Sequence, residues 1–182
     1  MSRSLGSLLA RIRLTIGLGF ILAFLVLAHP TAVSLLASGP LFLAGLFTRA
    51  WAAGHLVKRK TLTTAGPYAH TRNPLYFGSF LLLLGACVAA ASILLAAIAI
   101  PVFVFVHLLV IREEEALIRG NFGEAFEAYR AAVPSFFPRA RRGTTSEGSW
   151  SGAQYVKNGE YNATLGVIAA AAFLVLRILG RI

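Results

Sequence analysis

The chain has 182 residues, of which 57% are hydrophobic and only 13% are charged, about half the charged share of an ordinary soluble domain. Its 17 Lys and Arg outnumber seven acidic residues and give a net charge of +10. These basic residues lie between apolar runs and not among stacking aromatic residues, which favours an anionic membrane surface over nucleic acid as their partner. The single cysteine, Cys87, excludes an internal disulfide.

Five apolar runs predict the helices, and they cover residues 14–28, 31–48, 77–91, 92–111 and 162–176. A helix needs about 20 apolar residues to cross the hydrocarbon layer, so the second and fourth runs are long enough. The others depend on flanking residues or local bilayer thinning. His29-Pro30 separates the first two runs, the third and fourth meet near Ala91-Ser92, and Pro101 predicts a kink. We therefore expect an all-α, polytopic membrane bundle of about five transmembrane helices without a Rossmann domain.

Charge placement predicts the orientation of the chain. Nearly all of the 17 basic residues lie at the N-terminus, in segment 49–72 or in segment 112–157. The positive-inside rule then places the N-terminus and both long segments in the cytoplasm. Arg177 and Arg181 fit this rule less well: either the last helix crosses and ends in two exposed arginines, or it does not fully span.

The first segment that could perform chemistry precedes the third apolar run. Gly66-Pro67 is a turn signal, and Pro74 can open a helix at its first position, where its missing N–H costs nothing. Arg72 and Asn73 then lie at the N-terminal mouth of a membrane helix, which is a natural seat for a carboxylate or another anion. The alternative is a capped helix start with a snorkelling arginine.

The second segment follows the fourth apolar run without a helix breaker and begins with three consecutive glutamates, Glu113, Glu114 and Glu115. Neighbouring side chains on a helix point about 100° apart, so at most two of the three can line one site. An acidic cluster beside anionic lipid favours a role in binding a cationic group, and the alternative is a solvated helical collar. His55 and His107 have no partners at metal-ligand spacing, so we expect no metal site.

Together the two segments resemble the isoprenylcysteine carboxyl methyltransferase family, which includes phospholipid N-methyltransferase relatives. The motif reads Gly66-Pro67-Tyr68, three residues, then Arg72-Asn73-Pro74-Leu75-Tyr76, and its second half comprises Glu114-Glu115, Phe122-Gly123, Tyr129 and Val133-Pro134. The resemblance covers roughly residues 41–138, and the stretch 54–58 around His55 also resembles bacterial members. Asn73 replaces the usual histidine, which removes a titratable group and makes acid–base chemistry at that position unexpected.

The resemblance implies a methyltransferase that binds S-adenosylmethionine in a cytoplasmic-side pocket built from both segments. It implies that Arg72 and Glu115 are catalytic, with Arg72 holding a carboxylate of the cofactor or of the acceptor. The cofactor-binding residues that it implies are Tyr68, Asn73, Pro74, Tyr76, Glu114 and His55. Glu114 or Glu115 would meet the cationic end of the cofactor. Arg72 should therefore converge with the Glu114-Glu115 pair across the third and fourth helices.

The family relationship also organises the chain. We expect one membrane domain over 1–182, with a helical hairpin at 1–48, a catalytic core at 49–142, and a linker with a C-terminal membrane helix at 143–182. The bacterial features imply an inner-membrane protein and weaken the inference to prenylated proteins as acceptors. The expected partners are membrane lipids and a lipophilic or lipid-modified acceptor that enters sideways between helices.

Four functions remain open from the sequence. The first is O-methylation of a carboxylate, which needs little base catalysis because the nucleophile is already ionised at neutral pH. The second is N-methylation of a phospholipid amine, for which a carboxylate would take a proton. The others are an NADPH-dependent membrane reductase, for which no site for the cofactor's 2′-phosphate is identified, and a non-enzymatic membrane scaffold.

Overall fold

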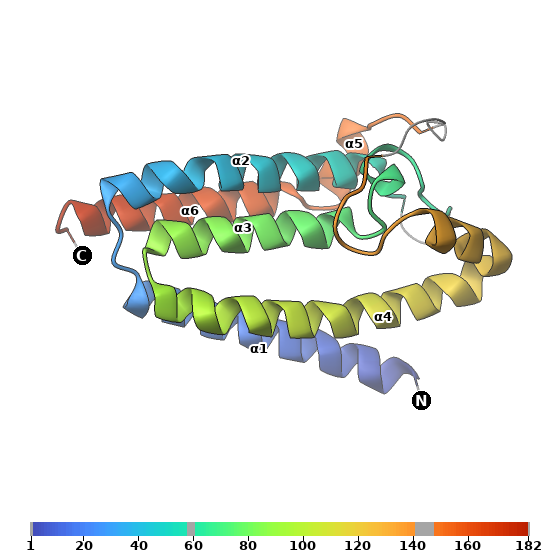
Figure 1. Cartoon of the computed structure of the whole chain (residues 1–182), viewed down its shortest axis with the longest axis horizontal. Coiled ribbons are helices and arrows are strands. Elements are labelled where there is room, and N and C mark those ends of the chain that lie inside the picture. Colours follow the sequence, from blue (N-terminus) through green and yellow to red (C-terminus); the bar gives the residue numbers. More distant parts are fainter. Residues whose placement is uncertain (1, 58–60, 141–147, 182) are drawn as a thin grey trace.

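A computed structural model describes residues 2–57, 61–140 and 148–181, with side chains from residue 15 onward within those ranges. Every regular element in these residues is helical, as the sequence predicted (Figure 1). The elements are α1 (Ser2–Leu27), α2 (Ala32–His55), the short 3₁₀ helix η1 (Gly66–Ala69), α3 (Pro74–Ala90), α4 (Ile93–Ala132), α5 (Gly152–Lys157) and α6 (Tyr161–Ile178).

The helices form two groups that diverge from the turn between α3 and α4. Helix α2 packs along α3 and also contacts α6, whereas α1 packs along α4 (Figure 1). Helices α1 and α2 run in opposite directions, and α1 packs more closely against α4 than against α2. The division of the chain into a hairpin, a core and a C-terminal segment stays a prediction.

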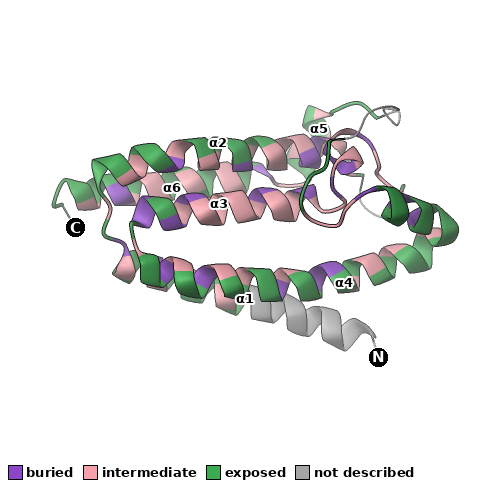
Figure 2. Cartoon of the chain, in the orientation of Figure 1, coloured by how far each residue is buried: buried purple, intermediate pink, exposed green. Residues whose placement is uncertain are grey.

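The outer surfaces of these helices are apolar. Helices α2, α4 and α6 are long and apolar enough to cross a membrane, while the apolar parts of α1 (Thr15–Leu27) and α3 are shorter. Many residues along these helices are exposed (Figure 2), including Val33, Leu36 and Ile93, which are 77%, 79% and 88% exposed. Such surfaces are stable in lipid and would be costly in water, so the chain is an integral membrane protein.

The boundary expected near Ala91-Ser92 is confirmed. Ala91 ends α3 in a left-handed conformation with φ 49° and ψ 36°, and the Ser92 hydroxyl accepts a hydrogen bond from Leu95 N at the start of α4. The backbone of α4 leaves helical geometry at Gly123 (φ 49°, ψ −123°), while Pro101 lies inside the helix, and a kink at Pro101 stays a prediction. Figure 1 shows the chain reversing near the end of α4. A positive φ is readily adopted by glycine, and this turn directs the last part of α4 back toward α3.

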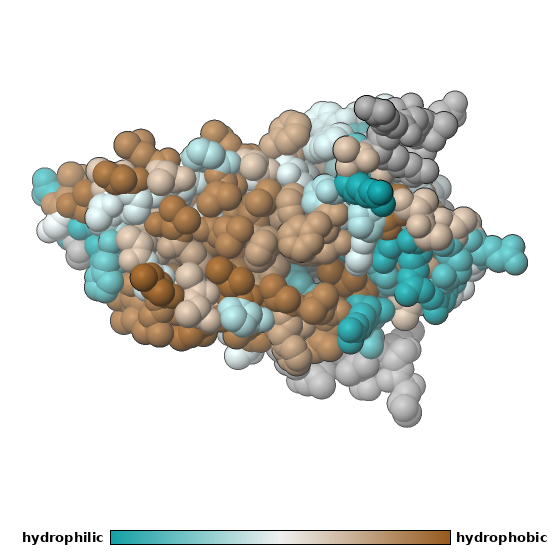
Figure 3. All heavy atoms as spheres, viewed as in Figure 1, coloured by the Kyte–Doolittle hydropathy of each residue, from teal (hydrophilic) through white to brown (hydrophobic). Residues whose placement is uncertain are grey.

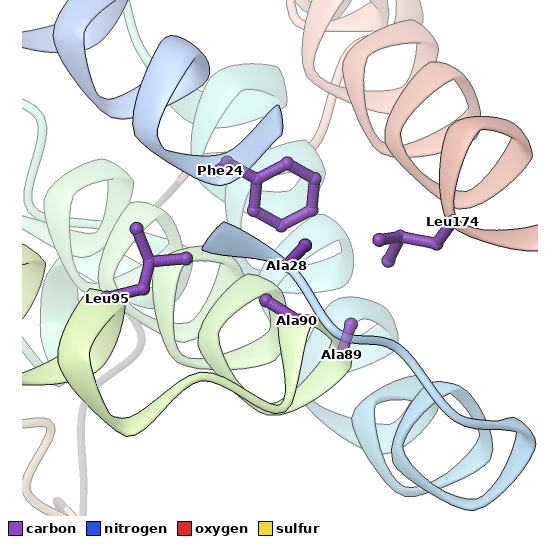
Figure 4. Close-up of a cluster of buried hydrophobic side chains, with 6 residues drawn as sticks. All are labelled: Phe24, Ala28, Ala89, Ala90, Leu95 and Leu174. Carbon is purple, nitrogen blue, oxygen red and sulfur yellow. The ribbon is translucent and has the colours of Figure 1, made fainter. Parts of the chain in front are cut away.

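Apolar side chains, half of them alanines, form a core cluster at the end of the bundle opposite this turn. The cluster joins α1, α3, α4 and α6 and consists of Phe24, Ala28, Ala89, Ala90, Leu95 and Leu174 (Figure 4). The alanines allow close approach of the backbones, and His29 N donates to the Ala90 carbonyl at 2.7 Å. This contact ties the connection between α1 and α2 to the last turn of α3.

Arg177, which fitted the charge rule poorly, has a structural partner. It lies in the last turn of α6, where its guanidinium donates to the Leu25 carbonyl near the end of α1. The same group lies 6.0 Å from the centroid of the Phe173 ring. The last carbonyls of a helix have no intrahelical donor, so Arg177 satisfies one of them at this end of the bundle.

Glycines set the distance between α2 and α3. A Cβ added to Gly45 would lie 3.0 Å from the Gly78 carbonyl oxygen and 2.7 Å from a methyl carbon of Leu82. A Cβ added to Gly78 would lie 3.0 Å from the Gly45 carbonyl oxygen. Membrane helices gain stability from such close packing because lipid supplies no hydrophobic force between them.

Replacing Gly45 with alanine should therefore separate α2 from α3. We expect Gly45→Ala to destabilise the protein by about 1–3 kcal/mol, the usual cost of overpacking, seen as a lower melting temperature in detergent. Gly39 on the same helix has nothing within 4 Å of an added Cβ, so Gly39→Ala should stabilise by about 0.5–1 kcal/mol. Equal shifts in the two variants would contradict this account of the contact.

Candidate functional site

Hydrophilic residues gather at the end of the molecule where α4 changes direction (Figure 3). We call this the polar end, and it consists of the C-terminus of α2, η1, the N-terminus of α3 and α4 beyond residue 111. All the residues that the sequence proposed for a site lie here. The lipid-facing surfaces of the helices, in contrast, are apolar.

Arg72 and Glu115 meet at the polar end although 43 residues separate them. Arg72 Nε donates to Glu115 Oε1 at 2.9 Å and Nη2 donates to Oε2 at 3.1 Å. Their side chains are only 10% and 17% exposed. Paired hydrogen bonds between a planar guanidinium and a carboxylate fix geometry as well as charge, so the two motif halves converge as the sequence predicted.

Arg72 also holds the end of α4. Its Nη1 donates to the carbonyls of Arg130 and Val133, and its backbone N–H donates to the Pro134 carbonyl at 2.9 Å. These carbonyls follow the turn at Gly123, in the final turn of α4 and just beyond it. Arg72 thus satisfies acceptors that a helix end leaves unpaired.

The Glu115 carboxylate is fully engaged by the protein. Besides the two bonds from Arg72, Oε1 accepts from Asn73 Nδ2 at 3.3 Å and from the Ser135 hydroxyl at 3.2 Å. Asn73 Nδ2 also donates to the Ser135 carbonyl at 3.0 Å and makes no capping bond to its own helix. Pro74 follows at the first position of α3, as predicted, and is buried there.

Glu114 differs from Glu115 because its carboxylate can accept further hydrogen bonds. Its Oε1 accepts a hydrogen bond from the Tyr76 hydroxyl at 2.7 Å, while its Oε2 has no hydrogen-bond partner among the described residues. The residue is exposed at the polar end. An ionised carboxylate accepts several hydrogen bonds, so Glu114 is the member of the pair that can receive a cationic ligand.

Tyr68 is a buried donor without an acceptor. The residue is 6% exposed, and its hydroxyl has no hydrogen-bond partner in the described part of the chain. Burial raises the pKa of this hydroxyl well above its usual value, and Tyr129, Glu160 and Glu114 raise it further. Leaving a buried polar group unpaired costs about 1–3 kcal/mol. The hydroxyl is therefore neutral and suited to donate to a polar ligand atom.

A second ion pair at the polar end was not foreseen from the sequence. Arg49 Nε donates to Glu160 Oε2 at 3.0 Å and Nη2 donates to Oε1 at 2.8 Å, joining α2 to the start of α6. Arg49 Nη1 donates to the Ser79 hydroxyl and to the Leu75 carbonyl. Glu160 is only 8% exposed. The available signal was an isolated acid just before an apolar run, which needs a partner if it is buried.

The segment before α6 caps α2. Asn158 Nδ2 donates to the Ala53 carbonyl at 2.8 Å, Gln154 Nε2 donates to the Leu56 carbonyl at 2.7 Å, and Trp150 Nε1 donates to the Ala50 carbonyl at 3.0 Å. The last four carbonyls of a helix lack intrahelical donors. Asn158 supplies such a donor to Ala53, Gln154 binds the carbonyl of the C-cap residue Leu56, and Trp150 adds a bond to Ala50 one turn earlier.

His55 packs against the short helix η1. Its Nδ1 is 2.9 Å from the Trp51 carbonyl oxygen, so this nitrogen carries the proton, and its ring packs on Gly66, which has φ +58°. A Cβ at Gly66 would lie 2.7 Å from the His55 ring. The His55 ring thus packs against the start of η1. Among the described residues, no hydrogen bond links it to Arg72 or Glu115.

A cavity of about 650 Å³ lies among the helices next to the polar end. Among the described residues that line it, Ser79 and His107 are the ones with polar side chains. Gly17 and Gly166 belong to its wall, with nothing within 4 Å of an added Cβ. Cavities of about 300–1,000 Å³ accommodate small organic ligands. No group of three potential metal ligands lies together in the part of the chain that the structure describes.

Comparison with known families shows which family the chain belongs to. The family model of phospholipid methyltransferases matches residues 14–125. The chain belongs to this phospholipid methyltransferase family. The match includes both carboxylates of the Glu114-Glu115 pair, the Arg72 motif and most of the apolar cavity, and it confirms the family resemblance seen in the sequence.

Two curated relatives come from bacteria. The chain is 41% identical over 93 residues to the nickel-cobalt-cadmium resistance protein NccN of Alcaligenes xylosoxydans xylosoxydans, a match covering 50% of this chain and 43% of that protein. It is 32% identical over 151 residues to the cobalt-zinc-cadmium resistance protein CzcN of Cupriavidus metallidurans, covering 76% of this chain and 69% of that protein. The chain thus spans less than half the length of NccN. No solved structure matches the chain.

The Arg72–Glu115 ion pair should contribute more to stability than the exposed ion pair between Arg119 and Glu127. Arg72→Ala removes the charged partner of Glu115 and the side-chain donor of the Arg130 and Val133 carbonyls, and breaking a largely buried pair costs about 3–5 kcal/mol. Arg119→Ala should change stability by less than about 1 kcal/mol, because Arg119 and its partner Glu127 are 53% and 47% exposed. Thermal unfolding in detergent measures both, and similar losses would contradict the assigned difference.

Proposed function

We propose that this protein is an S-adenosylmethionine-dependent methyltransferase that modifies a lipophilic acceptor within the membrane. The observation that carries the proposal is the combination of two groups at the polar end that can still form hydrogen bonds, the Glu114 carboxylate and the Tyr68 hydroxyl, with an apolar cavity among the helices. The Tyr76 ring connects the two regions, because its hydroxyl bonds Glu114 and its edge contacts His107 in the cavity wall.

The residues at the polar end suit this cofactor. S-adenosylmethionine supplies an electrophilic methyl group on a sulfonium, and it carries an ammonium group and several polar oxygens. In our proposal Glu114 receives a cationic group and Tyr68 donates to one of the cofactor's acceptors. Asn73, Pro74 and Tyr76 would shape the cofactor pocket between Glu114 and Tyr68. His55 would support this pocket indirectly, by packing against Gly66 of η1.

Arg72 and Glu115 receive a different role from the one that the motif implied. Their charged groups bind each other, and together they also bind Asn73, Ser135 and the end of α4. We therefore assign them to positioning the cofactor-binding residues. A substitution at either position would act on the site through the backbone and through Asn73.

The acceptor would place its apolar part in the cavity and its nucleophile toward His107 and Ser79, the polar residues of the cavity wall. Holding two reactants in line replaces an unlikely encounter with a unimolecular step. A carboxylate would react in this position without losing a proton, whereas an amine would have to lose one. Both acceptor classes fit the volume and apolar character of the cavity.

We also propose that the polar end faces the cytoplasm, where a water-soluble cofactor is supplied. Arg112, Arg119, Arg130 and Arg139 all lie beyond the membrane part of α4. The positive-inside rule places such arginine-rich connections on the cytoplasmic side.

Tyr68→Phe tests cofactor binding separately from protein stability, because the two are expected to change differently. Removing an unpaired buried hydroxyl should leave the free protein as stable as the wild type or more stable. The same change should weaken binding of S-adenosylhomocysteine, the demethylated cofactor, about tenfold, the value of one hydrogen bond. Calorimetric titration of purified protein in detergent measures the affinity, and thermal unfolding measures the stability.

Two further variants calibrate that titration. Glu114→Gln removes the proposed charge partner and should weaken binding about 10- to 100-fold. Glu124→Gln, which changes an exposed residue with no contact to the site, should leave it unchanged. Absence of binding to folded wild-type protein would contradict the proposed function, and unchanged binding in Tyr68→Phe would contradict the assignment of its hydroxyl.

Filling the cavity should separate acceptor binding from cofactor binding. Gly166 lines the cavity on α6 with open space around an added Cβ, so Gly166→Leu should occupy part of the volume without disturbing the polar end. We expect methyl transfer to a membrane lipid extract to fall at least about tenfold while S-adenosylhomocysteine binds as before. Gly39→Leu, outside the cavity and equally unobstructed, is the matched control. Loss of cofactor affinity in Gly166→Leu would contradict this separation.

A further inference from the structure

Three arginines line a small pocket between the two parts of α4 that the turn at Gly123 separates. The pocket has a volume of about 160 Å³ and is lined by Arg112, Glu115, Ala116, Arg119, Phe126 and Arg130. Arg112 and Arg119 lie before the turn, seven residues or about two helical turns apart, so they share one face of the helix. Arg130 lies after the turn, on the part of α4 that comes back toward α3.

The charge of this pocket is positive. The Glu115 carboxylate is bound by Arg72 through two hydrogen bonds, so its charge is already compensated from α3. Arg119 and Arg130 share a single carboxylate, that of Glu127, whose Oε2 lies 3.6 Å from Arg130 Nη1. Among the lining residues and these ion-pair partners, the arginines outnumber the glutamates by two. Such an excess of positive charge favours an anionic ligand.

Arg112 lies at the depth of the lipid headgroups. It is exposed, and it makes no hydrogen bond or ion pair among the described residues. No lysine, arginine or glutamate lies between Ile93, the first residue of α4, and Arg112. This part of the helix is about 28 Å long, and the hydrocarbon layer is about 30 Å thick. A helix that starts at one edge of this layer therefore reaches the other edge near Arg112, where the lipid phosphates begin.

We propose that Arg112, Arg119 and Arg130 form a binding site for the phosphate of an anionic membrane lipid of the phosphatidylglycerol class. A guanidinium binds phosphate through paired hydrogen bonds, and it has five N–H donors. The ion pairs with Glu127 therefore leave donors available on both of its arginines. Basic pockets at the ends of membrane helices are suited to such headgroups. This lipid has no amine and no carboxylate, so it is distinct from the methyl acceptor proposed above.

The bound phosphate connects the two parts of α4. Arg112 precedes the turn at Gly123 and Arg130 follows it, and the Arg130 carbonyl also accepts a hydrogen bond from Arg72. A phosphate held by both arginines stabilises the turn that brings the end of α4 to Arg72. The alternative is that these arginines attract the anionic membrane surface only as separate charges. In that case an arginine outside the pocket would contribute as much as one inside it.

The experiment compares dioleoyl phosphatidylglycerol with dioleoyl phosphatidylcholine, which has the same acyl chains and no net charge. Native mass spectrometry of the full chain in detergent micelles measures lipid binding, and thermal unfolding measures the melting temperature. We expect phosphatidylglycerol to bind at least about tenfold more tightly and to raise the melting temperature by about 3 °C or more. Glycerol 1-phosphate lacks the acyl chains that hold the headgroup near the pocket, so it should raise the melting temperature by less than about 1 °C.

Variants distinguish a built site from a diffuse attraction. Arg112→Gln and Arg130→Gln should each weaken phosphatidylglycerol binding about tenfold. Arg139→Gln is the matched control, because Arg139 is an exposed arginine that follows α4 and does not line the pocket, and it should bind the lipid like the wild type. All three side chains are exposed, so without added lipid the variants should unfold within about 2 °C of the wild type.

Three results would overturn the proposal. Equal binding of the two lipids by the wild-type protein would show that the pocket does not select an anionic headgroup, and this comparison needs no variant. An equal loss of affinity in Arg139→Gln would reduce the pocket to a diffuse attraction. Stabilisation by glycerol 1-phosphate as large as that by phosphatidylglycerol would assign the pocket to a free phosphate and not to a lipid.

Discussion

The guanidinium of Arg72 joins the three segments that make the polar end. It binds Glu115 through two hydrogen bonds and the carbonyls of Arg130 and Val133 through a third nitrogen, so one planar group connects the start of α3, the middle of α4 and its end. This connection requires the turn at Gly123, which brings the last part of α4 back toward α3. Near a bilayer, unpaired carbonyls and charges are costly. The geometry of the site therefore follows from satisfying these groups, and lysine at position 72 could not reproduce the paired contact.

At the polar end, polar groups whose hydrogen bonds are all made within the protein differ in role from groups that can still bind a ligand. Glu115 accepts hydrogen bonds from three side chains, and Glu160 is held by Arg49 through two, so these carboxylates build the structure. Glu114 and Tyr68 retain capacity to bind a ligand. Glu114 and Glu160 both raise the pKa of the Tyr68 hydroxyl, which lies near enough to feel both charges. The two ion pairs thus hold in place the groups that we propose for the cofactor.

Local sequence signals predicted the helices well. Contacts between residues that are far apart in the sequence and share no motif were missed. Proline chemistry identified Pro74 as the first residue of α3, and the family motif predicted that Arg72 and the glutamate pair converge. The motif did not identify which glutamate binds the arginine, because that depends on the rotation of α4 about its axis. The contact between Arg49 and Glu160 was also missed, since 111 residues separate them and neither position has a local pattern that names its partner. The apolar cavity, too, is a property of the space between five helices and of no single segment.

The cavity has an energetic role that differs from that of a pocket in a soluble enzyme. Burying an apolar chain from water yields about 0.8 kcal/mol for each CH₂ group, but a lipophilic acceptor in a bilayer is already surrounded by hydrocarbon. Moving it into the cavity therefore yields little hydrophobic free energy, and its affinity must come from shape and polar contacts. Gly17 and Gly166 provide the shape by leaving room between α1 and α6, and His107 provides a polar contact where the cavity meets the cofactor residues. In the proposed reaction the apolar wall would align the acceptor more than attract it, so selectivity would be decided at the polar head of the acceptor, where the methyl group would be transferred.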